Sequence, residues 1–130
     1  MRNLKRWTIL FTAVLAVAPG MAVGCGACIE DKMAATYDHA IVAEAAATGR
    51  LVVFYEFALA GDPNNVTAQL LRAVPQVKGV QRGSVRVSAV PPAFSFVLDP
   101  HAQTPQAVTA ELQRRVGNPA LHIKLIRVMG

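Results

Sequence analysis

Two cysteines lie close together near the start of the chain, in the tetrapeptide Cys25-Gly26-Ala27-Cys28. Two thiolates at this spacing can bind one soft metal ion, or one thiolate can attack a disulfide while the other resolves the mixed disulfide. At the start of a helix, free backbone N–H groups and the helix dipole favour the thiolate over the thiol. A structural disulfide is the alternative, but closing so short a loop adds little stability. The spacing therefore predicts thiols with a function.

The number of ligands that each metal needs bears on which metal the cysteines would hold. Two sulfurs alone satisfy linear or trigonal Cu(I), whereas tetrahedral Zn(II) needs two more ligands. A zinc ribbon would carry a second CxxC, and c-type haem attachment would place a histidine where Ile29 stands, so neither is expected. Cu(I) is the expected metal and Zn(II) the alternative. The candidate further ligands are Met33 and His39, and for zinc also Glu30, Asp31, His101 and His122.

Met33 and His39, the two candidate ligands for either metal, can each be interpreted without a metal. Met33 lies on an apolar helical stripe, where a methionine more often packs in a core than binds a metal. His39 lies away from the strongest apolar positions, which is typical of a solvated surface histidine. The sequence leaves these alternatives open.

The first 22 residues have the pattern of a secretory signal peptide. Basic residues precede an apolar run from Trp7 to Ala18, and small residues follow it. Cleavage after Ala22 would leave Cys25 near the new N-terminus, and a loose lipobox offers the alternative that Cys25 carries a lipid. Either interpretation predicts a secreted or periplasmic protein that contacts a membrane only through the signal or the lipid.

Hydrophobic spacing and capping residues predict one N-terminal helix followed by alternating strands and helices. The segment from Ile29 to Thr48 has apolar residues at helical spacing, and Glu30 and Asp31 in its first turn oppose thiolate formation at the cysteines. Leu51 to Leu59 reads as a strand that is apolar on both faces. The other predicted elements are a helix that starts at Pro63 behind Asp62 and is ended by Pro75, strands from Gly83 to Ser88 and from Ala93 to Leu98, a helix between Thr104 and Gly117, and a strand from Leu121 to Val128.

This βαββαβ order predicts an α+β fold of the ferredoxin-like type with an extra N-terminal helix. The first and third strands are the most apolar, so we expect them in the centre of the sheet. Val52 and Phe54 lie on the far face of the first strand, and we expect the N-terminal helix to cover them. The predicted organisation is a signal peptide (1–22), a CxxC segment with the extra helix (23–50), and a ferredoxin-like domain (51–130).

Four short segments share the pattern of a known family: Val77-Lys78-Gly79-Val80, Ser84-Val85-Arg86-Val87, Phe94-Ser95-Phe96-Val97-Leu98-Asp99-Pro100 and Thr104-Pro105-Gln106-Ala107-Val108. Through them the chain from Leu51 to Val128 resembles a heavy-metal-associated domain, which implies a ferredoxin-like fold and a heavy-metal ligand. That family binds its metal through Met-x-Cys-x-x-Cys after the first strand, but the corresponding loop here, Ala58 to Pro63, has no cysteine. Metal binding at Cys25 and Cys28 is therefore a separate prediction.

Composition narrows the function classes. The chain has 130 residues, of which 53% are hydrophobic and 16% charged, which excludes a disordered chain. Much of its net charge of +5 belongs to the leader and aromatics are 6%, so we expect no nucleic-acid partner. No nucleophile elbow or phosphate loop is present, and we do not expect an enzyme. The prediction is metal buffering, or transfer with a metal-donating or metal-accepting protein. The alternatives are a thiol-disulfide redox protein and a lipid-anchored interaction module without metal.

Overall fold

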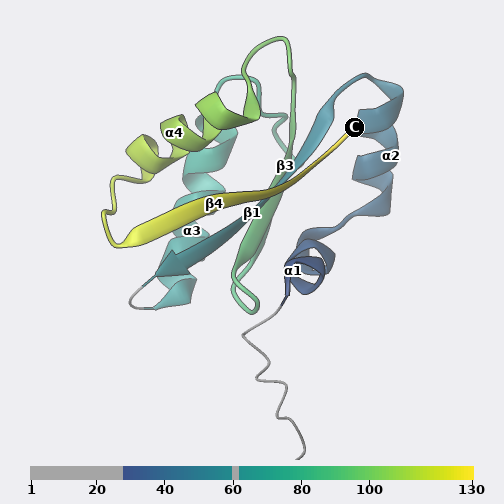
Figure 1. Cartoon of the computed structure of the whole chain (residues 1–130). Helices are drawn as coiled ribbons and strands as arrows, with labels where there is room; N and C mark the ends of the chain where they lie inside the picture. Colours follow the sequence, from purple (N-terminus) through teal and green to yellow (C-terminus); the bar gives the residue numbers. More distant parts are fainter. Residues whose placement is uncertain (1–27, 60–61) are drawn as a thin grey trace, which may run out of the picture.

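A computed structural model describes residues 28–59 and 62–130 (Figure 1). The predicted signal peptide, its cleavage site and Cys25 lie outside the described residues. The helices are α1 (Ile29–Thr36), α2 (His39–Ala47), α3 (Pro63–Ala73) with the short 3-10 turn η1 (Val74–Gln76), and α4 (Pro105–Val116). The strands are β1 (Leu51–Leu59), β2 (Arg86–Ser88), β3 (Ala93–Leu98) and β4 (Leu121–Met129).

The four strands form one antiparallel sheet in the order β2-β3-β1-β4. The first and third strands are central, as expected from their apolar sequences, and the remaining strands lie at the edges. The fold is therefore α+β, and its order of elements from β1 onward is compatible with a ferredoxin-like arrangement.

One face of the sheet packs against α3 and α4. Every second residue of β1 points to this face, and the aromatic rings of Tyr55 and Phe94 stack there with centroids 4.8 Å apart. The Tyr55 hydroxyl, which lies deep in the core, donates a hydrogen bond to the carbonyl oxygen of Pro105 at 3.2 Å. The buried members of this cluster include Val53, Tyr55, Phe57, Leu70, Phe94, Phe96, Leu98, Val108, Leu112 and Leu121.

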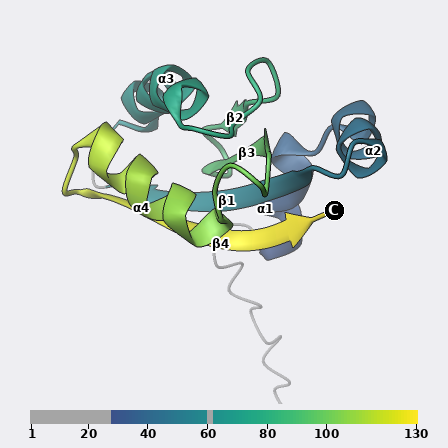
Figure 2. The ribbon, with the colours of Figure 1, turned by 90° about the horizontal axis from the view of Figure 1, so that it is seen from above.

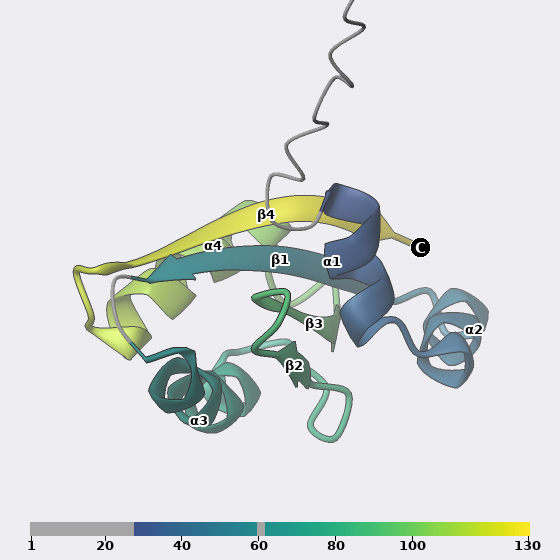
Figure 3. The same ribbon diagram turned by 90° about the horizontal axis from the view of Figure 1, so that it is seen from below.

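The opposite face of the sheet packs against α1 and α2, which gather at the other end of the molecule from α3 and α4 (Figures 2 and 3). Val52, Phe54 and Val97 are buried on this face together with Ala45. Met33, Ile41, Val42, Ile126 and Met129 pack around them. The prediction that N-terminal helical structure covers Val52 and Phe54 is confirmed.

The expectation of one helix from Ile29 to Thr48 is wrong, because the chain turns between α1 and α2. Tyr37 has extended backbone (φ −69°, ψ 128°), and Asp38 begins a new helix. The Asp38 carboxylate accepts hydrogen bonds from the backbone N–H groups of Ala40 (3.0 Å) and Ile41 (3.3 Å), which otherwise lack partners at a helix start. The break lets α2 turn around the end of the sheet while α1 lies across its face (Figure 3).

The expected strand from Gly83 to Ser88 is also shorter than predicted, because β2 begins only at Arg86. Gly83 has φ of 83°, a conformation that an extended strand does not have. The buried hydroxyl of Ser84 accepts a hydrogen bond from the Val97 backbone N–H at 2.9 Å, in the place of a strand carbonyl. A hydrogen bond to a side-chain hydroxyl therefore joins β3 to the segment ahead of β2, where a strand would use its backbone carbonyl.

Replacing Ser84 with alanine is expected to lower the free energy of unfolding by about 1–3 kcal/mol, because it leaves the buried N–H of Val97 without an acceptor. Urea denaturation followed by circular dichroism measures this change. The matched control is Ser88→Ala in β2, whose side chain makes no hydrogen bond within the described residues and should change stability by less than about 0.5 kcal/mol. Equal effects of the two substitutions would contradict the role given to the Ser84 hydroxyl.

Candidate functional site

The thiol of Cys28 lies at the N-terminal end of α1. Cys28 is the N-cap residue, with extended backbone (φ −64°, ψ 171°), and its carbonyl oxygen accepts the first helical hydrogen bond from Lys32 at 3.1 Å. Its side chain is exposed and free, and Sγ donates a hydrogen bond to the Asp31 carboxylate at 3.3 Å. The predicted placement of the second cysteine at the start of a helix is confirmed.

Acidic neighbours raise the pKa of this thiol. The backbone hydrogen bond from Asp31 lowers the pKa of Cys28, but the Asp31 carboxylate, desolvation and the Glu30 carboxylate together outweigh it, and the pKa is raised. The helix dipole alone would favour the thiolate, so the two acids of the first turn reverse the usual effect of this position. A metal ion that binds Cys28 would therefore have to displace a proton from a thiol whose pKa is above its ordinary value.

Replacing Asp31 with asparagine is expected to lower the pKa of Cys28, because the carboxylate that stabilises the thiol is lost while the backbone N–H stays. At a pH below the pKa of Cys28, a lower pKa increases the fraction of thiolate by more than it decreases the nucleophilicity of each thiolate. Alkylation should therefore be several-fold faster in the variant. Iodoacetamide kinetics against pH in a Cys25→Ser background measures this, and the rate curve should move to lower pH. Glu44→Gln on α2 makes the same charge change away from the thiol and should leave the curve in place.

The other predicted site residues do not gather around Cys28. Cys25 lies outside the described residues. Met33 is half-buried and packs against the α1–α2 face of the sheet. His39 is exposed at the first position of α2. Along the chain, His39 is separated from Cys28 by the eight residues of α1, which span about 12 Å of helix, and by Tyr37 and Asp38.

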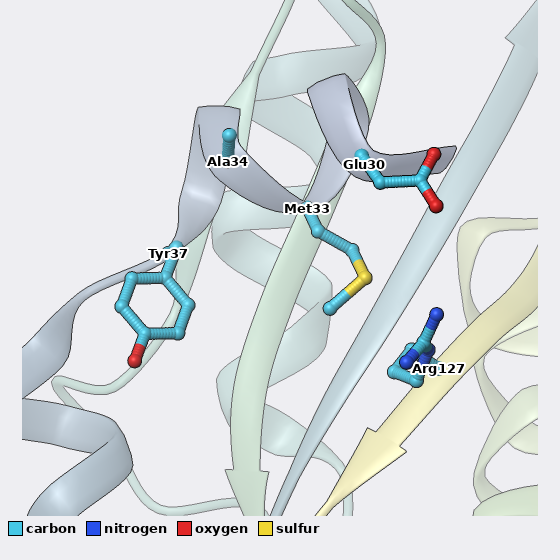
Figure 4. A pocket seen from close by; sticks show the side chains of 5 residues that line it. All are labelled: Glu30, Met33, Ala34, Tyr37 and Arg127. Carbon is cyan, nitrogen blue, oxygen red and sulfur yellow. The ribbon is translucent and has the colours of Figure 1, made fainter. Parts of the chain in front are cut away.

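A groove that the sequence analysis did not identify lies between α1 and β4. It is a hollow of about 400 Å³ lined by Glu30, Met33, Ala34, Tyr37 and Arg127. Figure 4 shows Glu30 and Arg127 at one end of the groove, Tyr37 at the other and Met33 between them. The groove therefore combines an apolar centre with two opposite charges and shares Glu30 with the surroundings of the thiol.

A bulge in β4 places Arg127 in this groove. Leu121, Ile123 and Leu125 point toward α3 and α4, and simple alternation would send residue 127 to the same side. The pairing instead jumps from Tyr55 opposite Leu125 to Phe54 opposite Arg127, which leaves Ile126 as the extra residue. The shift in register turns Arg127 to the α1 side of the sheet.

Polar contacts fix α1 on the sheet beneath it. Lys32 forms an ion pair with Glu56 of β1, and both side chains are mostly buried, at 17% and 23% exposed. Near the end of α1, the Ser95 hydroxyl of β3 donates a hydrogen bond to the Thr36 carbonyl oxygen at 3.1 Å. These contacts and Met33 hold the helix that carries Cys28.

Among the described residues, no three His, Cys, Asp or Glu side chains come together in a group that could hold a metal ion. In the same part of the chain, no helix is long and apolar enough to cross a membrane. No protein family, curated protein or solved structure matches this chain.

Proposed function

We propose that this chain is an extracytoplasmic protein that binds Cu(I) between Cys25 and Cys28 and buffers it or passes it to a partner. The observation that carries the proposal is the position of Cys28, whose free thiol is exposed at the N-cap of a helix fixed to the sheet. Cys25 precedes it by three residues, so two sulfurs can reach one metal ion.

The chemistry of the two sulfurs favours Cu(I) over Zn(II). Cu(I) is satisfied by two thiolates, whereas Zn(II) would need two further ligands. The raised pKa of Cys28 means that binding must release a proton, which makes metal uptake stronger as the pH rises. A site with only two ligands, one of them the exposed Cys28, also suits transfer, since a partner's thiolate can enter the coordination sphere.

We further propose that the chain from Leu51 onward is a ferredoxin-like domain of the heavy-metal-associated type whose metal-binding motif lies ahead of the domain. The support is the βαββαβ order and the β2-β3-β1-β4 sheet, together with the segments from Val77 to Val108 that resemble that family. The extra N-terminal helical structure then carries the Cys28 thiol at the start of α1, which packs on the face of the sheet opposite α3 and α4.

Native mass spectrometry of the mature protein under reducing conditions tests the proposed function. One copper ion should bind per chain, and Cys25→Ser and Cys28→Ser should each abolish this stoichiometric binding. Met33→Leu and His39→Ala are matched variants of the candidate further ligands and should retain the copper. Absence of copper binding by the reduced wild-type protein would overturn the proposal.

The same spectra separate the two alternative functions. A stable mass deficit of two hydrogens would indicate a disulfide, and a mixed disulfide trapped when the resolving cysteine alone is replaced would indicate a redox role. An acyl adduct on Cys25 without copper binding would indicate a lipid-anchored interaction module.

A further inference from the structure

β4 forms the longer edge of the sheet (Figure 3). It has nine residues, whereas β2 at the opposite edge has three. Within the described residues β1 is the only strand paired with β4, so the other side of β4 faces no strand. The backbone N–H and C=O groups of such an open edge can pair with another chain unless something covers them. The side chains around β4 therefore decide whether this edge associates.

The side chain of Gln113 covers the first part of this edge. From α4, its Nε2 donates a hydrogen bond to the Leu121 carbonyl oxygen at 2.7 Å, and its Oε1 accepts one from the Ile123 backbone N–H at 3.4 Å. Alternate residues of an antiparallel strand direct both backbone groups to the same side, so Leu121 and Ile123 present theirs at the open edge. One side-chain amide, with a donor and an acceptor, thus takes the place of a peptide group of a neighbouring strand.

Two other features of β4 oppose pairing without occupying its backbone groups. The bulge at Ile126 interrupts the regular edge in the second half of the strand. Lys124, whose side chain is 75% exposed, and the exposed Arg127 are basic, and β4 has no acidic residue. Two copies paired through β4 would therefore place like charges close together, which is unfavourable. Gln113 adds to these features a direct cover of the backbone.

We propose that Gln113 guards the β4 edge and prevents it from pairing with β4 of a second copy of this chain. A second copy is the occupant that the open edge fits, because two antiparallel β4 strands related by a two-fold axis offer each other the same donors and acceptors. With Gln113 in place, the Leu121 carbonyl and the Ile123 N–H are already bonded, and association would have to break both bonds. The guard needs neither cysteine and is independent of the proposed copper site.

Sedimentation equilibrium of the mature protein, in reducing buffer without metal, tests this inference. The wild-type protein should remain monomeric, and Gln113→Ala should self-associate at least about tenfold more tightly, because each copy then has two unpaired backbone groups at the edge. Gln113→Asn keeps the amide but is one methylene shorter, so it cannot reach both groups and should also associate. The matched control is Gln106→Ala, an exposed position of α4 whose side chain makes no hydrogen bond within the described residues, and it should remain monomeric.

Hydrogen exchange distinguishes a guard from a contact that only stabilises α4 on β4. In dilute Gln113→Ala the Ile123 amide should exchange faster than in the wild-type protein, because its acceptor is gone. Raising the protein concentration should protect this amide again as the β4 strands pair. A contact that only stabilises would give fast exchange at every concentration.

Charge variants in the Gln113→Ala background locate the contact. Lys124→Gln removes a like charge from each paired strand and should tighten association several-fold, whereas Arg82→Gln makes the same charge change ahead of β2, at the other edge, and should leave it unchanged. Circular dichroism establishes that each variant is folded, and Gln113→Asn carries the test if Gln113→Ala is not. A folded variant that stays monomeric at every concentration, association without protection of Ile123, or a wild-type protein that associates as tightly as the variant would overturn the proposal.

Discussion

Replacing Phe54 with alanine is expected to lower the free energy of unfolding by about 3–5 kcal/mol. The ring is completely buried on the face of the sheet that α1 and α2 cover, beside Val52 and Val97. Its removal loses the transfer free energy of the ring and leaves a cavity that the short helices can close only in part. Small domains are stable by roughly 5–15 kcal/mol, so the loss is a large fraction of the total. Urea denaturation followed by circular dichroism measures it.

The matched substitution on the other face is Phe96→Ala, which removes an equally buried ring from the cluster under α3 and α4. Both variants should lose similar stability if the two clusters unfold as one unit. Hydrogen exchange distinguishes the two variants. Only Phe54→Ala should reduce the protection of the α1 amides by more than the loss of stability of the whole protein explains. A loss below about 1 kcal/mol in Phe54→Ala would contradict a second core layer beneath α1.

The capped helices were predictable because their signals are local. Asp62 accepts a hydrogen bond from the Asn64 backbone N–H and Pro63 follows it, as their residue types predict for a helix start. Thr104 caps α4 in the same way, and Gly117 ends it in the left-handed conformation with φ of 61°. Such positions depend on a few neighbouring residues and need no knowledge of the tertiary structure.

The break between α1 and α2 was missed because the apolar spacing runs through it. Met33, Tyr37 and Ile41 are four residues apart, which is typical of one continuous helical stripe. The structure buries only parts of that stripe and leaves Tyr37 44% exposed. Asp38 was the available signal, since an aspartate ahead of an alanine-rich segment is a preferred N-cap.

The candidate site was predictable only in its local part. The placement of Cys28 at a helix start and the opposing effect of Glu30 and Asp31 on its thiolate follow from neighbouring residues, and both are confirmed. The groove was not predictable, because Arg127 reaches it through a bulge whose position depends on pairing with β1. Side chains from opposite ends of the chain meet there, and no sequence spacing encodes their meeting.

Replacing Glu56 with glutamine is expected to lower the free energy of unfolding by about 2–3 kcal/mol. The carboxylate is the counter-charge of Lys32, whose side chain is only 17% exposed beneath α1. Breaking a fully buried pair costs about 3–5 kcal/mol and an exposed pair at most about 1 kcal/mol, and this pair lies between these limits. Urea denaturation measures the change, and hydrogen exchange should show that α1 loses protection because its anchor on β1 is gone.

Lys124 provides the control for this ion pair, because it approaches the same carboxylate from β4 at 3.8 Å but is 75% exposed. Lys124→Met should therefore cost less than about 0.5 kcal/mol, whereas Lys32→Met removes the desolvated partner. In a double-mutant cycle, Lys32→Met with Glu56→Gln should show coupling above about 1 kcal/mol, and Lys124→Met with Glu56→Gln close to none. Equal coupling of the two lysines would contradict the view that burial under α1 gives the Lys32 pair its strength. Stronger coupling of Lys32 than of Lys124 would identify Glu56, together with Ser95, as a residue of the sheet that fixes the helix carrying Cys28.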